Sequence, residues 1–287
     1  MNRRNSHGFL SALASFAILV AATAGLAQTD PLPSWNEGPA KKAIVEFVRA
    51  TTDSSNTNFV RPEERIATFD QDGTLWVSHP LYAQAMFALD RVHALAPKHP
   101  RFERPYTDLV YQPMLELMRY LRASGYRTYI VTGGGQEFVR AYGERVYGVP
   151  PEHVIGSSTL TKFQVESGKP VLMREPKVFF IDDKGGKPVG IHLFIGRRPQ
   201  AAFGNSMGDA EMLQWTKAGS GARLAMLVLH DDAKREFAYG PAAGLPETRV
   251  GAFPPALMDE AKKGGWIVIS MKKDWKRIFS FDQPAAR

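Results

Sequence analysis

The chain has 287 residues, with 36 Lys and Arg against 29 Asp and Glu, and it contains no cysteine. The missing cysteines exclude a disulfide scaffold, a zinc ribbon and a thiol nucleophile. A hydrophobic content of 44% with 23% charged residues excludes wholesale disorder, and the formal charge of +7 leaves an anionic partner open.

The N-terminal segment, residues 1–27, has the pattern of an export signal. Arg3 and Arg4 give it a positive start, an uncharged apolar stretch follows, and Gly25 and Ala27 put small residues where signal peptidase reads them. We expect cleavage near Ala27 and a periplasmic or secreted mature protein. Two positive charges leave with the segment, so the mature net charge would be +5. The alternative is an uncleaved membrane anchor, because the run approaches the length that spans a bilayer.

Lys and Arg are scattered along the rest of the chain and form no nucleic-acid-binding motif. The one tight cluster, Lys272, Lys273, Lys276 and Arg277, is most simply a solvated face near the C-terminus. We therefore expect no nucleic-acid partner, and no stable membrane association once the signal is removed. The oligomeric state is left open.

After a linker at residues 28–38, helical and extended patterns alternate. Helical spacing predicts helices at 39–51, 81–96, 108–123, after 135 to 146, and 208–217. Short apolar runs predict strands at 65–69, 126–131, 200–203, 224–229 and 266–271, with further β character at 170–181. This alternation predicts an α/β fold, a Rossmann-like and mostly parallel sheet flanked by helices.

Polar residues follow three of the predicted strands. Asp70, Thr132 and Asn205 each stand where a strand ends. The carboxyl ends of parallel strands meet at one edge of the sheet, so these residues should converge on one crevice.

The segment Phe69-Asp70-Gln71-Asp72-Gly73-Thr74-Leu75 places two carboxylates at i and i+2 after a buried strand. In an extended ending both point to the same side, and they repel unless a cation lies between them or one is protonated. Such a pair suits a nucleophile that also binds metal, beside a proton donor. A pair of turn or capping aspartates is the other interpretation.

Three segments together resemble a known family. Phe69 to Leu75 resembles motif one of the haloacid dehalogenase superfamily, the Asp-nucleophile phosphohydrolases. Tyr129-Ile130-Val131-Thr132-Gly133-Gly134 resembles motif two in its phosphoserine phosphatase-like branch, and Phe203-Gly204-Asn205-Ser206-Met207-Gly208-Asp209 resembles the acidic motif four. They occur in the family's order, so the chain is identified as a member of this superfamily. With the export signal at its N-terminus, it would be an exported bacterial member.

The resemblance assigns the reacting groups. It implies that Asp70 is the nucleophile that takes the phosphoryl group and that Asp72 is the general acid and base. Thr132 and the backbone N–H of Gly133 would bind phosphoryl oxygens, although Thr132 could simply cap a helix. The family also needs a lysine at the site. Lys187 is chosen because helix-like spacing follows it, with Lys184 as the alternative.

The resemblance further implies a Mg²⁺ cofactor. Asp70, the backbone carbonyl of Asp72, Asp209 and Asn205 are the expected ligands. Asn205 departs from the family pattern, which has an acid at this position, and it contributes no charge. This departure puts metal affinity and catalytic strength in question rather than the fold.

The interval between motifs one and two is longer than a simple crossover needs, and the family often carries a cap there. We expect residues 28–75 and 125–287 to form the catalytic core and 76–124 a small helical cap inserted after the first catalytic strand. Trp76 is the best candidate for substrate contact. The expected function is phosphomonoester hydrolysis on a small phosphorylated substrate. The alternatives are a weakly active member that binds a ligand or protein, or a phosphotransferase to an acceptor alcohol.

Overall fold

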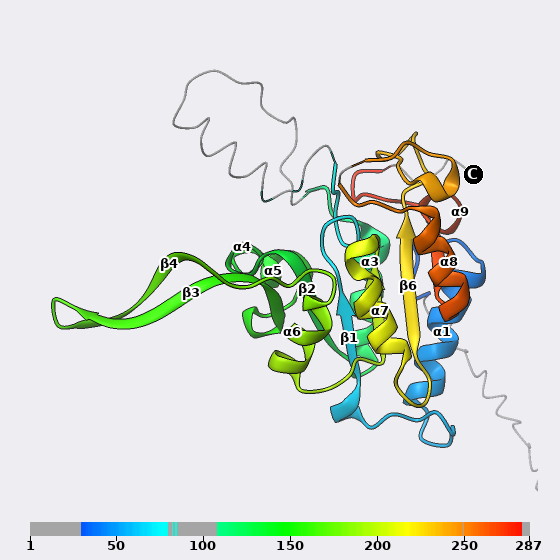
Figure 1. The fold of residues 1–287 in the computed structure, drawn as a ribbon. Helices are drawn as coiled ribbons and strands as arrows, with labels where there is room; N and C mark the ends of the chain where they lie inside the picture. The colour runs from blue at the N-terminus through cyan, green and yellow to red at the C-terminus, as the bar shows by residue number, and fades with distance from the viewer. Residues whose placement is uncertain (1–29, 80–81, 83, 85–107, 249, 283–287) are drawn as a thin grey trace, which may run out of the picture. The chain divides into compact units, whose positions relative to one another are not determined.

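The computed structural model describes residues 30–79, 82, 84, 108–248 and 250–282 (Figure 1). The predicted signal segment lies outside the described residues, and so does nearly all of the predicted helix at 81–96. Apart from Asp30, the described residues belong to one compact unit, Pro31–Arg287. Within the described residues, no helix combines the length and the apolar character needed to cross a bilayer.

The centre of the unit is a seven-stranded sheet in the order β4-β3-β2-β1-β5-β6-β7. Every neighbouring pair is parallel except β3 and β4, which form an antiparallel hairpin. The strands are β1 (Ile66–Phe69), β2 (Arg127–Gly135), β3 (Val154–Glu166), β4 (Lys169–Phe180), β5 (Ala201–Gly204), β6 (Leu224–Leu229) and β7 (Ile267–Ser270). The prediction of a mostly parallel α/β sheet is confirmed.

Helices connect the strands and cover the sheet (Figure 1). The described α-helices are α1 (Pro39–Thr52), α3 (Gln112–Ala123), α4 (Gln136–Arg140), α5 (Gly143–Tyr147), α6 (Gly186–Ile195), α7 (Ala210–Lys217), α8 (Pro255–Gly264) and α9 (Met271–Asp274). Short 3₁₀ turns are η1 (Pro62–Glu64), η3 (Pro151–His153), η4 (Met207–Asp209) and η5 (Pro241–Ala243).

Alternation along the strands divides the interior into two cores. In β6, Met226 and Val228 belong to the core that contains α1 and α3, while Leu227 belongs to the core that contains α6, α7 and α8. Successive side chains of a strand point to opposite faces, so a strand covered on both sides reads as a continuous apolar run. All six residues of β6 are buried accordingly.

Two segments differ from the sequence prediction. The helix expected after residue 135 is broken into α4 and α5, and β3 was not predicted although its outer half alternates polar and apolar residues. The helix expected at 108–123 is α3, and its buried residues Met114, Leu117 and Met118 pack in the main core. Most of the rest of the expected cap is outside the described residues, so the cap remains a prediction.

Candidate active site

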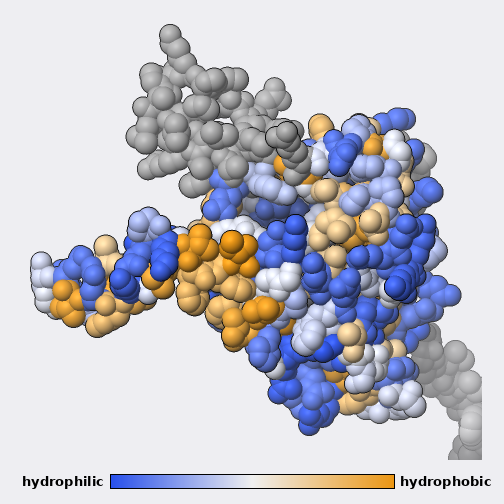
Figure 2. Space-filling model, in the orientation of Figure 1, coloured by the Kyte–Doolittle hydropathy of each residue, from blue (hydrophilic) through white to orange (hydrophobic). Residues whose placement is uncertain are grey.

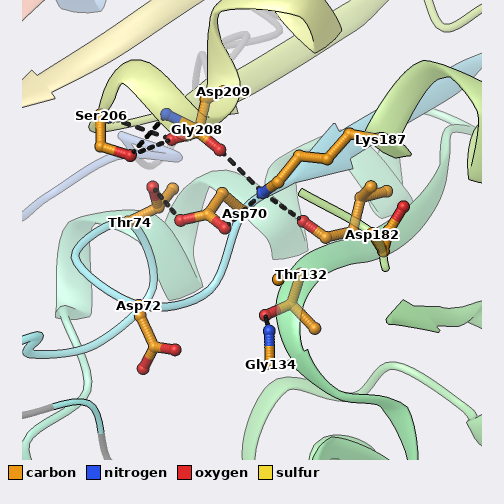
Figure 3. Close-up of polar contacts among 12 residues, drawn as sticks. Asp70, Asp72, Thr74, Thr132, Gly134, Asp182, Lys187, Ser206, Gly208 and Asp209 are labelled. Carbon is orange, nitrogen blue, oxygen red and sulfur yellow. Dashed lines mark hydrogen bonds and ion pairs between the residues drawn. The ribbon is translucent and has the colours of Figure 1, made fainter. Parts of the chain in front are cut away.

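A pocket of about 590 Å³ opens at the carboxyl ends of β1 and β2. It brings together six of the residues predicted from the sequence, namely Asp70, Asp72, Thr132, Gly133, Lys187 and Asp209. Figure 3 shows Asp70, Lys187 and Asp209 meeting from separate parts of the chain, with Asp72 and Thr132 nearby. The expected convergence of strand ends is what brings them together, because β2, β1 and β5 are adjacent in the sheet.

Asp70 is the first residue after β1. Its backbone N–H donates to the carbonyl oxygen of Phe203 at 2.9 Å, which continues the pairing of β1 with β5. Its Oδ1 accepts a hydrogen bond from Lys187 Nζ at 2.6 Å, and its Oδ2 accepts one from the Thr74 hydroxyl at 3.2 Å. Burial, and next the charge of Asp209, raise the pKa of Asp70 to about 8, while Lys187 acts in the opposite direction.

Lys187 lies in the first turn of α6 and is almost completely buried, at 2% exposure. Its ammonium donates to Asp70 Oδ1 at 2.6 Å, to Asp209 Oδ1 at 2.7 Å and to the Val131 carbonyl at 2.8 Å. Burial alone would lower the pKa of Lys187, but the charges of Asp209 and Asp70 outweigh it and raise the pKa. The side chain is therefore a fixed cation with all three N–H groups used. The alternative lysine, Lys184, is exposed.

Asp209 holds the loop after β5. Its Oδ2 accepts the backbone N–H groups of Asn205 at 2.9 Å and Ser206 at 3.0 Å, while Oδ1 faces Lys187. A capping box with Ser206 fixes the 3₁₀ turn η4. Both oxygens of Asp209 thus have protein partners, and its role as a metal ligand remains a prediction.

Asp72 stands on the turn that follows Asp70 and lines the pocket. Its Oδ1 accepts a hydrogen bond from the indole Nε1 of Trp76 at 2.7 Å. Trp76 itself is buried, at 2% exposure, and stacks on Tyr142, with ring centroids 5.1 Å apart. The structure places Trp76 behind Asp72 rather than in the pocket wall, and its predicted contact with substrate remains untested.

Thr132 and Gly133 form the opposite wall, on the last residues of β2. The Thr132 hydroxyl accepts the backbone N–H of Gly134 at 3.0 Å within β2. The following helix α4 starts after Gly135 without a side-chain cap, so the helix cap expected as one alternative for Thr132 is not formed. Thr132 and Gly133 also line the pocket beside Asp72. Backbone amides and a hydroxyl in this arrangement suit an anionic ligand.

Asn205 is buried beneath the turn after β1. One terminal atom of its amide lies 3.0 Å from the carbonyl oxygen of Asp72 and 3.2 Å from Oδ2 of Asp70, and the other lies 3.0 Å from the Tyr239 hydroxyl. With nitrogen inward, the amide donates to both oxygens. With oxygen inward, the amide oxygen lies beside the Asp72 carbonyl oxygen and Asp70 Oδ2. The oxygen and nitrogen of an amide have nearly the same size, so the groups that surround the Asn205 amide determine which of the two atoms points inward.

The inward-oxygen arrangement fits Mg²⁺. Oxygens about 2.1 Å from an octahedral Mg²⁺ stand ~3.0 Å apart, close to the observed 3.0 and 3.2 Å separations. The donor set of carboxylate, carbonyl and amide oxygens has the hard character that this ion prefers. In the part of the chain that the structure describes, no cluster of three or more His, Asp or Glu side chains has metal-binding geometry. The candidate ligands are instead Asp70, the Asp72 carbonyl and Asn205.

Two features of the site were not identified from the sequence. Tyr239 supports the Asn205 amide and also lies 3.0 Å from the Ser78 hydroxyl, and burial keeps its pKa well above the usual value. Asp182 is fully buried beside the site, and neither carboxylate oxygen makes a hydrogen bond within the described residues. No motif marks Tyr239, since it lies 34 residues beyond Asn205 and meets it only in the fold.

Comparisons with known proteins bear on this geometry. The family model of haloacid dehalogenase-like hydrolases matches residues 77–214, a range that contains Thr132, Lys187 and Asp209 and begins after the turn with Asp70 and Asp72. A comparison with curated proteins finds no match.

Solved structures with similarity to the chain include a conserved protein of unknown function from Anaerococcus prevotii. It shares 25% identity over 43% of this chain and 32% of its own length, with a TM-score of 0.35, so the match spans about a third of that protein. A phosphoserine phosphohydrolase-like protein from Francisella tularensis shares 15% identity over 58% of this chain and 88% of its own, with a TM-score of 0.35. A probable phosphoserine phosphatase from Vibrio cholerae shares 14% identity over 73% of this chain and 68% of its own length, with a TM-score of 0.35.

The family match covers the second and fourth motifs, and the first motif stands directly against them in the fold. Asp70 touches Lys187, and Lys187 touches Asp209, both of which lie within the matched range. Residues 77–214 of the chain thus match the haloacid dehalogenase-like hydrolases.

Proposed function

We propose that the protein is an exported, Mg²⁺-dependent phosphomonoester hydrolase that works through an aspartyl-phosphate on Asp70. The observation that carries the proposal is the position of Lys187, whose ammonium bonds Asp70 at 2.6 Å and Asp209 at 2.7 Å in a buried site. A buried cation against the nucleophile reduces its repulsion toward an approaching phosphate dianion.

Asp70 and Asp72 divide the chemistry between them. In the first half-reaction an Asp70 oxygen attacks phosphorus, the bond from phosphorus to the ester oxygen breaks, and Asp72 gives a proton to that leaving oxygen. In the second, Asp72 takes a proton from water as the water attacks phosphorus, which releases inorganic phosphate and restores Asp70. The 2.7 Å hydrogen bond from Trp76 supports this role because it orients the Asp72 carboxyl.

The remaining groups would stabilise the phosphoryl oxygens, and Lys187 would do so through its charge, because its three N–H groups already have partners. Lys187, the Thr132 hydroxyl and the backbone N–H of Gly133 surround the same pocket as the two aspartates. Their charge and dipoles would stabilise the negative charge that spreads over the equatorial oxygens during transfer. When bound by Asp70, the Asp72 carbonyl and Asn205, Mg²⁺ would add positive charge beside the nucleophile.

The activity is tested on purified mature protein with a panel of phosphate monoesters, assayed with Mg²⁺ and with EDTA. We expect turnover that requires Mg²⁺ and that falls at least about 10³-fold in Asp70→Asn. Asp183→Asn is the matched control, because Asp183 lines the same pocket without contacting Asp70 or Lys187 through any hydrogen bond that the structure describes. It should retain activity within a few fold.

Three outcomes contradict the proposal. Absence of turnover on every ester, with no difference between the wild type and Asp70→Asn, would favour a binding module. Product that forms only when an acceptor alcohol is present would favour a phosphotransferase. Equal losses in Asp70→Asn and Asp183→Asn would mean that Asp70 has no special role.

The metal assignment is tested by Asn205→Asp. The substitution adds a negative charge where the amide now faces Asp70 and the Asp72 carbonyl, so Mg²⁺ should bind at least about tenfold more tightly. Titration calorimetry with MgCl₂ alone measures this without reference to activity. Asn58→Asp, at an exposed position, makes the same change of charge away from the site. Equal Mg²⁺ affinity in both variants would remove Asn205 from the proposed ligand set.

Export is tested by the N-terminus of the protein recovered from its host. The basic start and uncharged apolar stretch before Ala27 support cleavage. We expect the periplasmic or secreted fraction to contain a chain that starts near Gln28. Recovery of a cytoplasmic chain that retains Met1 would show that the segment is not a cleaved signal.

A further inference from the structure

The hairpin of β3 and β4 leaves the sheet as a two-stranded ribbon. Pairing of β3 with β2 ends at Ser157, and from Ser158 onward β3 pairs only with β4 (Figure 1). Directly paired residues of antiparallel strands point to the same face. The pairs Thr159–Val178, Thr161–Arg174, Phe163–Leu172 and Val165–Pro170 therefore share one face, and the pairs Lys162–Met173, Gln164–Val171 and Glu166–Lys169 share the other.

The first of these faces is apolar and exposed. Phe163 is 69% exposed, Leu172 71%, Val165 60% and Val178 62%. The opposite face is largely polar, with the ion pair between Lys162 and Glu175. The ribbon is thus amphipathic. On its apolar face Arg174 forms an ion pair with Glu137 of α4 at 3.7 Å, and the apolar side chains of that face remain exposed.

More exposed apolar side chains lie at the base of the ribbon. Phe179 and Ile181 follow on the chain, and Val189, Leu193 and Phe194 come from α6, all between 49% and 64% exposed. Figure 2 shows hydrophobic residues gathered from the base of the ribbon to α6. We call these five residues together with Phe163, Val165, Leu172 and Val178 the ribbon patch.

An uncovered ribbon of this kind is unfavourable in water. A two-stranded hairpin is at best marginally stable unless a helix or another sheet packs on its hydrophobic face. Contiguous apolar patches of this size on soluble proteins mark interaction surfaces. The ribbon patch therefore implies an occupant.

The shape of the ribbon restricts the occupant. Its tip is the polar turn Glu166-Ser167-Gly168-Lys169, so the apolar residues lie along the flank rather than at the end. A ribbon that inserts its tip into a lipid surface would need apolar residues at the tip and polar residues along the flank. Extension of the sheet along the free edge of β4 is also disfavoured, because Pro170 and Pro176 lack the N–H that a new strand would need. The remaining mode of contact is packing of the apolar flank against the face of another structural element.

We infer that the ribbon patch is the interface of a homodimer, in which the ribbons of two copies pack apolar face to apolar face across a two-fold axis. An isologous contact needs only that one patch complement itself, and two apolar ribbon faces stacked ~10 Å apart do so. If all nine side chains, each about 60% exposed and each with on the order of 150 Å² of surface, were fully buried, the contact would reach at most roughly 800 Å² per copy, which is the area of a standard stable interface.

The inference is tested by sedimentation equilibrium and light scattering of the mature wild type over a wide range of concentration. Leu172→Asp puts a charge on the apolar face, and Gln164→Asp puts the same charge on the polar face at an equally exposed strand position. We expect a wild-type dimer, at least a tenfold rise in the dissociation constant for Leu172→Asp, and an unchanged dimer for Gln164→Asp. Circular dichroism and thermal melting of each variant show that the fold is kept.

Cysteine cross-linking locates the contact. The chain has no cysteine, so any disulfide between two copies of a variant must form through the introduced thiol. Thr161→Cys, on the apolar face, should form an intermolecular disulfide on oxidation, and Gln164→Cys should not.

Several results would overturn the inference. They are a wild type that is monomeric at every concentration, equal dissociation in Leu172→Asp and Gln164→Asp, or cross-linking in Gln164→Cys alone. A monomer that sediments with anionic phospholipid vesicles through Leu172 would instead make the ribbon patch a membrane-docking surface.

Discussion

At the scale of single residues, the buried ammonium of Lys187 supplies the positive charge that two carboxylates of the site share. It lies between two carboxylates that would otherwise face each other without water, and its three hydrogen bonds of 2.6 to 2.8 Å fix its position. A pair of buried charges adds little net stability, but removing one partner leaves the other uncompensated. The same residue therefore matters for both the fold and the proposed reaction.

We predict that Lys187→Met is strongly destabilising, by roughly 3 to 5 kcal/mol, because Asp70 and Asp209 lose their shared counter-charge. Urea unfolding at neutral pH measures the change. Lys184→Met, three residues earlier and exposed, should alter the free energy of unfolding by no more than about 0.5 kcal/mol. A larger loss of phosphatase activity in Lys184→Met than in Lys187→Met would reverse the choice between the two lysines.

Asp182 is a fully buried carboxyl that the proposed reaction does not use. Burial, together with the charges of Asp183 and Asp209, raises its pKa to about 7, and Lys187 opposes the rise. Between pH 4 and 7 the folded protein therefore keeps a proton that the unfolded chain has lost. Folded stability from this group is present at low pH and is lost as the pH rises through that window.

Asp182→Asn should accordingly stabilise the protein at pH 8, by roughly 4 kcal/mol, and change little at pH 4. The measurement is the free energy of unfolding as a function of pH for wild type and variant. Asp259→Asn, an exposed aspartate on α8, serves as the control. A parallel pair of pH profiles for wild type and Asp182→Asn would show that Asp182 carries no strained charge.

Some of these residues were accessible from the sequence and others were not. Asp70, Thr132 and Asn205 each follow a short apolar run, so strand ends alone indicate that they meet. Lys187 was chosen by the helical spacing after it and by a resemblance, and α6 is indeed a helix there. Tyr239 and Asp182 carry no local signal, because their importance comes from burial against distant side chains.

At the scale of elements, the turn after β1 brings the catalytic segment and the loop after β5 together. Gly73 adopts φ of +84°, in the left-handed region, and an added Cβ would lie 2.1 Å from the amide of Asn205. The Gly73 carbonyl also lies 2.7 Å from Nε2 of His230. The turn is thus fixed from both sides, and glycine is the residue that fits it.

Gly73→Ala should cost about 1 to 2 kcal/mol for its backbone conformation and a further penalty for displacing Asn205. We also expect weaker Mg²⁺ binding, measured by calorimetry. Gly244→Ala is the matched control, since Gly244 also has a positive φ, +72°, but an added Cβ there would meet no other atom within 4 Å. If both variants lose the same stability and the same Mg²⁺ affinity, close packing of Gly73 on Asn205 has no functional consequence.

The parallel strands were predictable as elements and the ribbon was not. Strands such as β6 are covered on both faces, so their apolar runs stand out against the chain around them. The outer half of β3 alternates Thr, Leu, Thr, Lys, Phe, Gln and Val, a period of two whose apolar side chains have no core to explain them. Recognition of that alternation would have predicted the strand.

At the scale of the whole molecule, the sheet collects groups from four distant parts of the chain into one pocket. β1 supplies Asp70, β2 supplies Thr132, α6 supplies Lys187 and the loop after β5 supplies Asp209. The net charge of +7 falls to +5 if the signal segment is removed, a mild excess that suits a small anionic ester. The central claim is that this pocket transfers a phosphoryl group to Asp70.

That claim is tested most directly by trapping the covalent intermediate. Protein mixed with an excess of a hydrolysed phosphate ester and Mg²⁺ is quenched in acid during turnover, digested, and analysed by mass spectrometry. We predict that the peptide containing Asp70 gains the mass of one phosphoryl group, that hydroxylamine removes it, and that Asp70→Asn abolishes it. Turnover of the ester with no phosphoryl group on that peptide, or with the group on another residue, would contradict the account.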